Sequence, residues 1–240
     1  MNKLKSFCNE NNYPISEKQL AQFETYYEML IEKNKVMNLT AITEKEDVVL
    51  KHFIDSVSMV FSVTKVDGLK DKKLKLIDVG TGAGFPGIPL KILFPDLDVV
   101  LLDSLNKRVN FLNEVILSLG LKDIKAIHSR AEEGGRNKEL RDHFDIAVSR
   151  AVANLPVLLE YTLPFVKKNG YFISYKSGEV DEEILNASHA LKCLNGDIVE
   201  DIRITLPDSD IKRSFIVVKK TAPTPKAYPR KAGTAKKDPL

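Results

Sequence analysis

The segment LIDVGTGAGFPGIPL, residues 76–90, constrains the fold of this chain more than any other stretch. An apolar run leads into a turn that holds four glycines in eight positions. Gly82, Gly84 and Gly87 match the G-x-G-x-x-G pattern of a strand–turn–helix unit, in which missing side chains let a nucleoside cofactor approach the backbone. Such a ligand lies at the carboxyl ends of parallel strands. The segment therefore predicts an α/β fold with a cofactor at this turn.

The alternation of apolar patterns after residue 74 supports the same fold. Short β-branched or leucine-rich runs alternate with amphipathic segments at 105–119, 154–165 and near 180–194, which is typical of a doubly wound parallel sheet. Two further runs, DIVEDIRITL and RSFIVVKK, are separated only by PDSDIK and indicate an antiparallel pair at one edge. We expect a seven-stranded Rossmann-like sheet with helices on both faces. The five predicted parallel strands are LKLIDV, DVVLLD, IKAIHS, FDIAVS and GYFISYK.

The first seventy residues have helical rather than strand periodicity. Residues 16–37 place apolar side chains on one helical face, with Ser16 as the N-cap, and residues 44–62 repeat the pattern. The sequence thus predicts three parts: an N-terminal helical cap over residues 1–70, a Rossmann-like domain over 71–220, and a basic, proline-rich tail over 221–240.

Composition limits the classes of protein to consider. Of 240 residues, 43% are hydrophobic and 29% charged, as in ordinary globular proteins. The start lacks the apolar region of a signal peptide, and no segment approaches the roughly 20 apolar residues of a membrane span. Cys8 and Cys193 lie far apart without metal-ligand spacing. We expect a cytoplasmic protein with no membrane segment and no metal.

Positive charge is concentrated in the tail. Residues 221–240 carry five lysines and arginines against Asp238 alone, so the other 220 residues are close to neutral. Such a segment cannot bury enough surface to fold alone. It is either a solvated terminus or an arm along a phosphate backbone, with Arg230 and Lys231 as candidate RNA contacts. In the second case its deletion weakens RNA binding and spares cofactor affinity.

The residues around the turn distinguish between cofactors. Asp103 ends the second predicted strand about twenty residues after the turn, where a carboxylate accepts hydrogen bonds from ribose hydroxyls. Nicotinamide cofactors and S-adenosylmethionine both carry that ribose. Asp78 would repel a pyrophosphate but not an ammonium or sulfonium group. Pro86 and Pro89 remove N–H groups that would bind a diphosphate. These features favour S-adenosylmethionine, with an NAD-dependent oxidoreductase as the alternative.

With these residues established, the chain resembles the bacterial 16S rRNA guanine-N7 methyltransferase family (RsmG, also called GidB), which are class I S-adenosylmethionine-dependent enzymes. The resemblance implies methyl transfer to N7 of a guanine in a conserved loop of 16S rRNA. It also implies cofactor contacts at Gly80, Phe85, Ala131, Glu132 and Arg150, and it matches a family lysine to Lys176. The motifs that carry it are NLTAI (38–42), HFIDS (52–56), DVGTGAGFPGIPL (78–90), LLDSLNKRVNFL (101–112), SRAEE (129–133), SRA (149–151), YKSG (175–178) and YPRKAGT (228–234).

The residues present suit that chemistry. The fourth strand is followed by Ser149-Arg150-Ala151, not by the Asn/Asp-Pro-Pro-aromatic segment of enzymes that methylate exocyclic amines, and no cysteine nucleophile is nearby. Guanine N7 needs neither, because its lone pair is free at neutral pH. We expect direct in-line transfer without a general base or covalent enzyme intermediate, with Arg150 and Lys176 contributing by position and charge.

Other functions stay open at this point: a methyltransferase of another RNA or a small molecule, or a non-catalytic RNA-binding protein. We expect a monomer that acts on 16S rRNA or the small ribosomal subunit. His52 and Asp55 either bond to each other or face the RNA, and Lys107 and Arg108 either meet phosphate or are solvated. The candidate cofactor residues are Asp78, Gly80, Gly82, Gly84, Phe85, Asp103, Ala131, Glu132 and Arg150; the candidate RNA residues are Asn38, His52, Asp55, Lys107, Arg108, Lys176, Arg230 and Lys231.

Overall fold

The computed structural model describes residues 1–64 and 73–240, and its centre is one seven-stranded sheet in the order β3-β2-β1-β4-β5-β7-β6. The first five strands are parallel, and β7 runs antiparallel between β5 and β6. The predicted sheet and its closing hairpin are therefore confirmed. The strands are β1 (Lys75–Val79), β2 (Asp98–Asp103), β3 (Ile124–His128), β4 (Phe144–Arg150), β5 (Val166–Ser177), β6 (Gly196–Thr205) and β7 (Lys212–Lys220).

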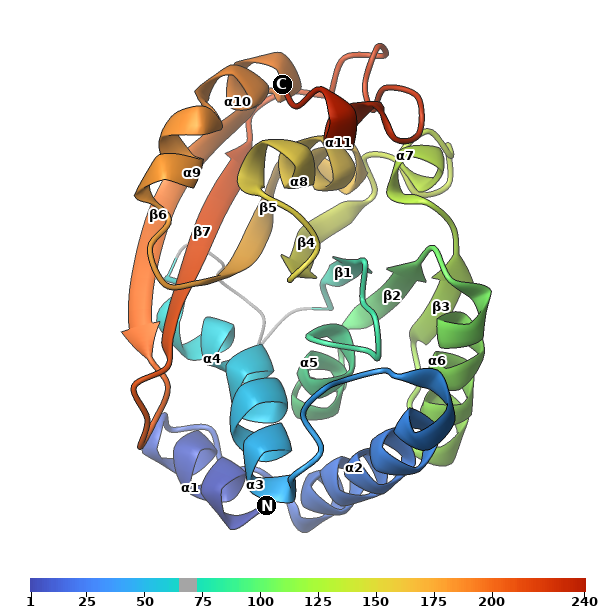
Figure 1. The fold of residues 1–240 in the computed structure, drawn as a ribbon, viewed down its shortest axis with the longest axis vertical. Helices are drawn as coiled ribbons and strands as arrows, with labels where there is room; N and C mark the ends of the chain where they lie inside the picture. Colours follow the sequence, from blue (N-terminus) through green and yellow to red (C-terminus); the bar gives the residue numbers. More distant parts are fainter. Residues whose placement is uncertain (65–72) are drawn as a thin grey trace.

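Helices cover both faces of the sheet. Figure 1 shows α1–α6 on one side and α7–α11 on the other. The predicted helix near 180–194 is divided into two short helices. The predicted helix at 44–62 is continuous, but six residues within it form a π-helix, η1. The helices are α1 (Asn2–Glu10), α2 (Glu17–Met37), α3 (Lys45–Val48), η1 (Val49–Ile54), α4 (Asp55–Ser62), α5 (Gly87–Leu93), α6 (Asn106–Ser118), α7 (Ala131–Gly134), α8 (Leu155–Thr162), the 3-10 helix η2 (Leu163–Phe165), α9 (Asp181–Asn186), α10 (Ser188–Leu194) and α11 (Thr234–Lys237).

The N-terminal helices share an apolar core with the sheet and pack against α5 and α6. One buried apolar cluster combines side chains of α1, α2 and α4 with α5, α6 and one face of the strands, and a second cluster fills the other face under α8 and α10. The predicted boundary between cap and domain at residue 70 lies outside the described residues. No helix within residues 1–64 and 73–240 is long and apolar enough to cross a membrane.

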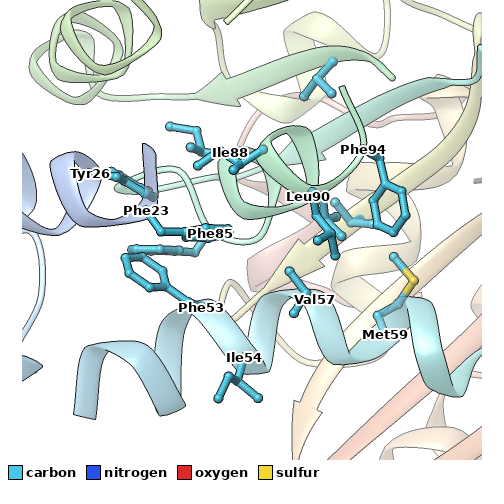
Figure 2. Close-up of a cluster of buried hydrophobic side chains, with 14 of the residues drawn as sticks. Phe23, Tyr26, Phe53, Ile54, Val57, Met59, Phe85, Ile88, Leu90 and Phe94 are labelled. Atoms are coloured by element: carbon cyan, nitrogen blue, oxygen red, sulfur yellow. The ribbon is translucent and has the colours of Figure 1, made fainter. Parts of the chain in front are cut away.

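An aromatic cluster joins the N-terminal helices to the glycine turn (Figure 2). The ring of Phe85, in the turn after β1, lies 5.3 Å from that of Tyr26 in α2 and 6.1 Å from that of Phe53 in η1. The Tyr26 hydroxyl donates a hydrogen bond to the carbonyl of Ala83 at 2.7 Å. The aromatic stripe of α2 therefore serves as core, and it also supports the turn from beneath.

The start of α2 offers a test of local stabilisation. The Ser16 hydroxyl accepts a hydrogen bond from the Gln19 N–H at 3.2 Å, and the Gln19 side chain accepts one from the Ser16 N–H at 2.9 Å. Because Ser16→Ala removes half of this capping box, we expect it to lower the free energy of unfolding by about 1 kcal/mol. Urea denaturation measures this, with Ser6→Ala on the exposed side of α1 as the control. Equal stability of both variants would contradict the prediction.

Candidate active site

The turn after β1 has a backbone that requires glycine. Gly80, Gly82 and Gly84 have φ angles of +75°, +63° and +109°, in the left-handed region that side chains disfavour. A Cβ on Gly80 would lie 2.6 Å from a methyl carbon of Val152, and one on Gly84 would lie 2.5 Å from Ile88. At Gly80 and Gly84 the turn therefore leaves no room for a side chain, whereas a Cβ on Gly82 would meet open space.

Asp78 lies beneath this turn. Its side chain is fully buried, and Oδ2 accepts hydrogen bonds from the Thr81 hydroxyl at 2.7 Å and the Gly87 N–H at 2.8 Å. Burial raises the pKa of Asp78 to about 7. Asp78 therefore holds the turn and the start of α5 together, a role that the sequence analysis missed. The other oxygen of Asp78, Oδ1, has no hydrogen-bond partner among the described residues. That Asp78 contacts the cofactor stays a prediction, and Oδ1 is the atom that would make the contact.

A first cavity of about 450 Å³ opens where β1, β2 and β3 end. It brings together four predicted cofactor residues, Gly80, Asp103, Ala131 and Glu132, and it includes a part of the tail that the sequence analysis did not place there. The residues that line it are Val79, Gly80, Leu102, Asp103, Ser104, Ser129, Arg130, Ala131, Glu132, Val152, Tyr161, Gly233, Lys236 and Lys237.

Two buried carboxylates define the chemistry of the first cavity. Asp103 accepts hydrogen bonds from the Gly82 and Leu105 N–H groups, both at 2.9 Å. Glu132 accepts one from the Gly233 N–H at 2.8 Å. Carboxylates bind hydroxyl and amino donors and repel phosphate. These two carboxylates suit ribose hydroxyls and an adenine amine, and Arg130, Lys236 and Lys237 line the same cavity.

A second cavity of about 410 Å³ lies where β4 and β5 end beside η1. It brings together His52, Asp55 and Lys176, which were predicted for RNA or catalysis, and Arg150, which was predicted for catalysis and for the cofactor. Val152, two residues after Arg150, lines the first cavity, so the segment that follows β4 lies at both cavities. The residues that line the second cavity are Ile42, Lys51, His52, Asp55, Arg150, Ala151, Ala153, Tyr175, Lys176, Ser177, Glu183, Ile211 and Arg213.

Asp55 is the centre of this second cavity's charge network. Its side chain is only 2% exposed, and it binds Arg150 Nη1 through Oδ2 and Arg213 Nε through Oδ1, each at 2.8 Å. A His52–Asp55 bond was one of two alternatives predicted from the sequence, but Asp55 has two arginines as partners instead. Arg213 comes from β7, far along the chain, and no local sequence pattern indicates it.

His52 contacts the aromatic cluster and a threonine. Its ring stacks on Phe85 with centroids 4.6 Å apart, and its Nε2 lies 2.8 Å from the Thr40 hydroxyl. Burial and the nearby positive charge of Arg150 lower the pKa of His52 to about 4, so the ring is neutral. Phe85 also lies under Arg150, whose guanidinium carbon is 5.2 Å from the ring centroid.

The neutral ring predicts a pH dependence of stability. The pKa of His52 is about 4 in the folded state and about 6.5 in the unfolded chain, so its contribution is complete above pH 6.5 and falls with pH toward 4. Between about pH 7.5 and pH 5, we expect the free energy of unfolding to fall about 2 kcal/mol further in the natural protein than in His52→Gln. Asp78 titrates in both proteins, so the comparison cancels it. Parallel pH profiles from urea denaturation would contradict this assignment.

The remaining predicted residues are placed as follows. Lys176 Nζ pairs with Glu183 at 2.6 Å and donates to the Ala153 carbonyl at 2.7 Å, so it has protein partners within the second cavity. Arg108 contacts Asp103 at 3.4 Å, beside the first cavity. Asn38 caps α2 in a left-handed conformation, and Lys107 is exposed. The roles predicted for these side chains toward RNA stay predictions.

The tail is folded, which corrects the expectation of a solvated terminus. Arg141 donates hydrogen bonds to the carbonyls of Thr224 at 2.7 Å and Tyr228 at 2.9 Å, and Ala235 is only 1% exposed. Arg230 pairs with the buried Glu160 of α8, whereas Lys231 is exposed. Figure 1 shows this segment beside α7 and α8. The buried partners come from the folded domain, and composition alone cannot indicate them.

Residues 19–212 match the family described as rRNA small subunit methyltransferase G. The chain belongs to this family. It is 56% identical to the rRNA small subunit methyltransferase G of Lachnoclostridium phytofermentans, over 94% of this chain and 91% of the relative. The same protein of Alkaliphilus metalliredigens is 52% identical, over 99% of this chain and 97% of the relative. The chain is thus an enzyme of the methyltransferase class, as its turn and its cavities indicate.

Solved structures share the fold at low identity. The fibrillarin pre-rRNA processing protein of Methanococcus jannaschii has a TM-score of 0.53 at 15% identity, over 69% of this chain and 74% of that one. TYW2 of Pyrococcus horikoshii has a TM-score of 0.52 at 12% identity, over 70% and 62%. At this low identity, the similarities show only that these proteins share the fold of the sheet and its helices.

Proposed function

We propose that this enzyme methylates N7 of a guanine in 16S rRNA, with S-adenosylmethionine as methyl donor. The observation that carries the proposal is the pair of cavities separated by the segment after β4. The first contains two buried carboxylates that suit the donors of a nucleoside cofactor, and the second contains lysine and arginine side chains that suit RNA, held by Asp55 and Glu183. Family membership supports the same assignment. In this proposal the protein acts in the cytoplasm as a monomer.

The first cavity would hold the cofactor through this chain's own donors and acceptors. Asp103 would accept hydrogen bonds from ribose hydroxyls, and the second oxygen of Glu132 would accept one from an adenine amine or ribose. When bound, S-adenosylmethionine supplies an electrophilic methyl group on a sulfonium. TYW2 of Methanococcus jannaschii, whose TM-score to this chain is 0.50 at 17% identity over 62% of this chain and 69% of that one, was solved in complex with AdoMet.

The second cavity would hold the guanine. Its N7 lone pair is free at neutral pH, so the transfer requires no proton acceptor. His52, whose pKa is lowered to about 4, is uncharged at neutral pH and is not needed as a general acid or base. Arg150 can donate one hydrogen bond to O6 while N7 stays open, since a bidentate contact would cover N7. Asp55 holds Arg150 through Nη1. Catalysis then depends on orientation and on fixed charges near the acceptor.

A substrate panel tests the proposal against its alternatives. Naked 16S rRNA, small ribosomal subunits and tRNA from cells that lack the enzyme are incubated with it and methyl-labelled S-adenosylmethionine. We expect label in 16S rRNA, free or within the subunit. Label in tRNA alone would indicate another RNA substrate. No label in any of the three, or calorimetric binding of NADH without binding of S-adenosylmethionine, would contradict the proposal.

A further inference from the structure

The C-terminal strap, residues 221–240, is held to the domain by a buried ion pair. Glu160 of α8 is only 1% exposed and accepts hydrogen bonds from three groups of Arg230: its backbone N–H at 2.6 Å, Nε at 3.1 Å to each carboxylate oxygen, and Nη2 at 2.7 Å. Such an arrangement fixes both the backbone and the side chain of Arg230. Removal of the arginine would leave Glu160 as an unpaired buried charge.

Beyond this pair the strap reaches the first cavity. The Gly233 N–H donates to Glu132 Oε1 at 2.8 Å, and Gly233, Lys236 and Lys237 line the cavity. Ala235, between them, is buried. The hydrogen bond occupies one oxygen of Glu132 and so orients the carboxylate, and the other oxygen is left for a ligand. The strap is therefore a wall of the cavity as well as a terminus.

We propose that the C-terminal strap completes the cofactor cavity, and that Arg230 acts as a positioning residue that holds Gly233 against Glu132. The identity of the cofactor rests on the proposed function. Gly233 follows Arg230 by only three positions. Loss of the Arg230–Glu160 pair would therefore also release the Gly233 N–H from Glu132. This reverses the expectation from composition that deletion of the tail spares cofactor affinity.

Two variants and a control test the proposal through cofactor binding. The first ends the chain after Lys231, which removes the wall but keeps Arg230 and Glu160. The second is Arg230→Ala. The control is Lys226→Ala, which removes a positive charge from an exposed position of the same strap. Calorimetry with S-adenosylhomocysteine should show binding about tenfold weaker or worse for both variants, which corresponds to about 1.4 kcal/mol, and unchanged binding for the control.

Kinetics separate positioning from a general structural role. For Arg230→Ala we expect the KM for S-adenosylmethionine to rise while kcat at saturating cofactor stays within about twofold, since the reacting atoms are elsewhere. Arg230→Lys, which keeps the charge but not the planar fork, should restore binding only in part. A fall in kcat with unchanged KM would overturn the positioning role.

Tryptic digestion of the full chain gives a readout that needs no variant. Saturating S-adenosylhomocysteine should slow cleavage after Lys236 and Lys237 at the cavity, while cleavage after the exposed Lys226 stays unchanged. Equal cleavage with and without bound ligand, or a folded truncated chain with the affinity of the full one, would overturn the proposal. If the full chain binds no S-adenosylhomocysteine at all, the proposed function fails instead.

Discussion

Replacement of Asp55 by alanine is expected to lower the free energy of unfolding by about 3 kcal/mol and to remove most methyl transfer. The carboxylate of Asp55 is almost fully buried between Arg150 and Arg213, which are themselves only 14% and 18% exposed. Its loss would leave two guanidinium groups close together without their shared counter-charge. The cost therefore combines lost hydrogen bonds with repulsion between the arginines.

Asp47→Ala is the matched control for this variant. Asp47 pairs with Lys51 one helical turn away, and its side chain is 47% exposed. Exposed pairs of this kind contribute only about 0.3–0.5 kcal/mol. Urea denaturation should therefore separate the two variants by more than 2 kcal/mol. A loss below about 1 kcal/mol for Asp55→Ala would show that the buried network adds little to stability.

Arg150→Ala is expected to lower kcat/KM for rRNA by about 100- to 1,000-fold, the range for loss of one fixed donor at a reacting centre. Arg150 lines the second cavity and lies over Phe85, and Asp55 and the Lys51 carbonyl orient it. Because the guanidinium lines the second cavity, we expect the affinity for S-adenosylhomocysteine to change by less than about threefold.

Arg150→Lys should be as inactive as Arg150→Ala. An ammonium group lacks the planar fork that lets a guanidinium bind Asp55 and a base edge at the same time. Arg203→Ala serves as the control, since Arg203 lies on the edge strand β6, away from both cavities, and pairs with Asp181 of α9. Single-turnover transfer to rRNA and calorimetric binding distinguish the outcomes. If Arg150→Ala lost cofactor binding and kept its rate at saturating cofactor, the side chain would belong to the first cavity.

Much of the fold could be predicted because its determinants are local. The N-cap at Ser16, the glycine turn and the hairpin between β6 and β7 each depend on neighbouring residues. The placement of Gly80, Asp103 and Glu132 at one cavity follows from a general rule, since the ends of parallel strands meet at one edge of a sheet.

The partners of charged groups could not be predicted in the same way. Arg230 and Glu160 are separated by 70 positions, and Asp55 and Arg213 by 158, so their pairing depends on the completed packing. Asp78 also has a structural role that no local pattern indicates, because the turn folds over it and its Oδ2 accepts hydrogen bonds from Thr81 and Gly87. Sequence indicates which residues carry charge, whereas the fold decides which charges are paired internally.

The central claim is that the two cavities present a methyl donor to guanine N7. It is tested most directly by incubating 16S rRNA with the enzyme and S-adenosylmethionine that carries a deuterated methyl group, followed by mass spectrometry of the nucleosides. We expect deuterated 7-methylguanosine as the labelled product, formed about 100- to 1,000-fold more slowly with Arg150→Ala. Label on an exocyclic amine, on a pyrimidine carbon or on a ribose hydroxyl would contradict it.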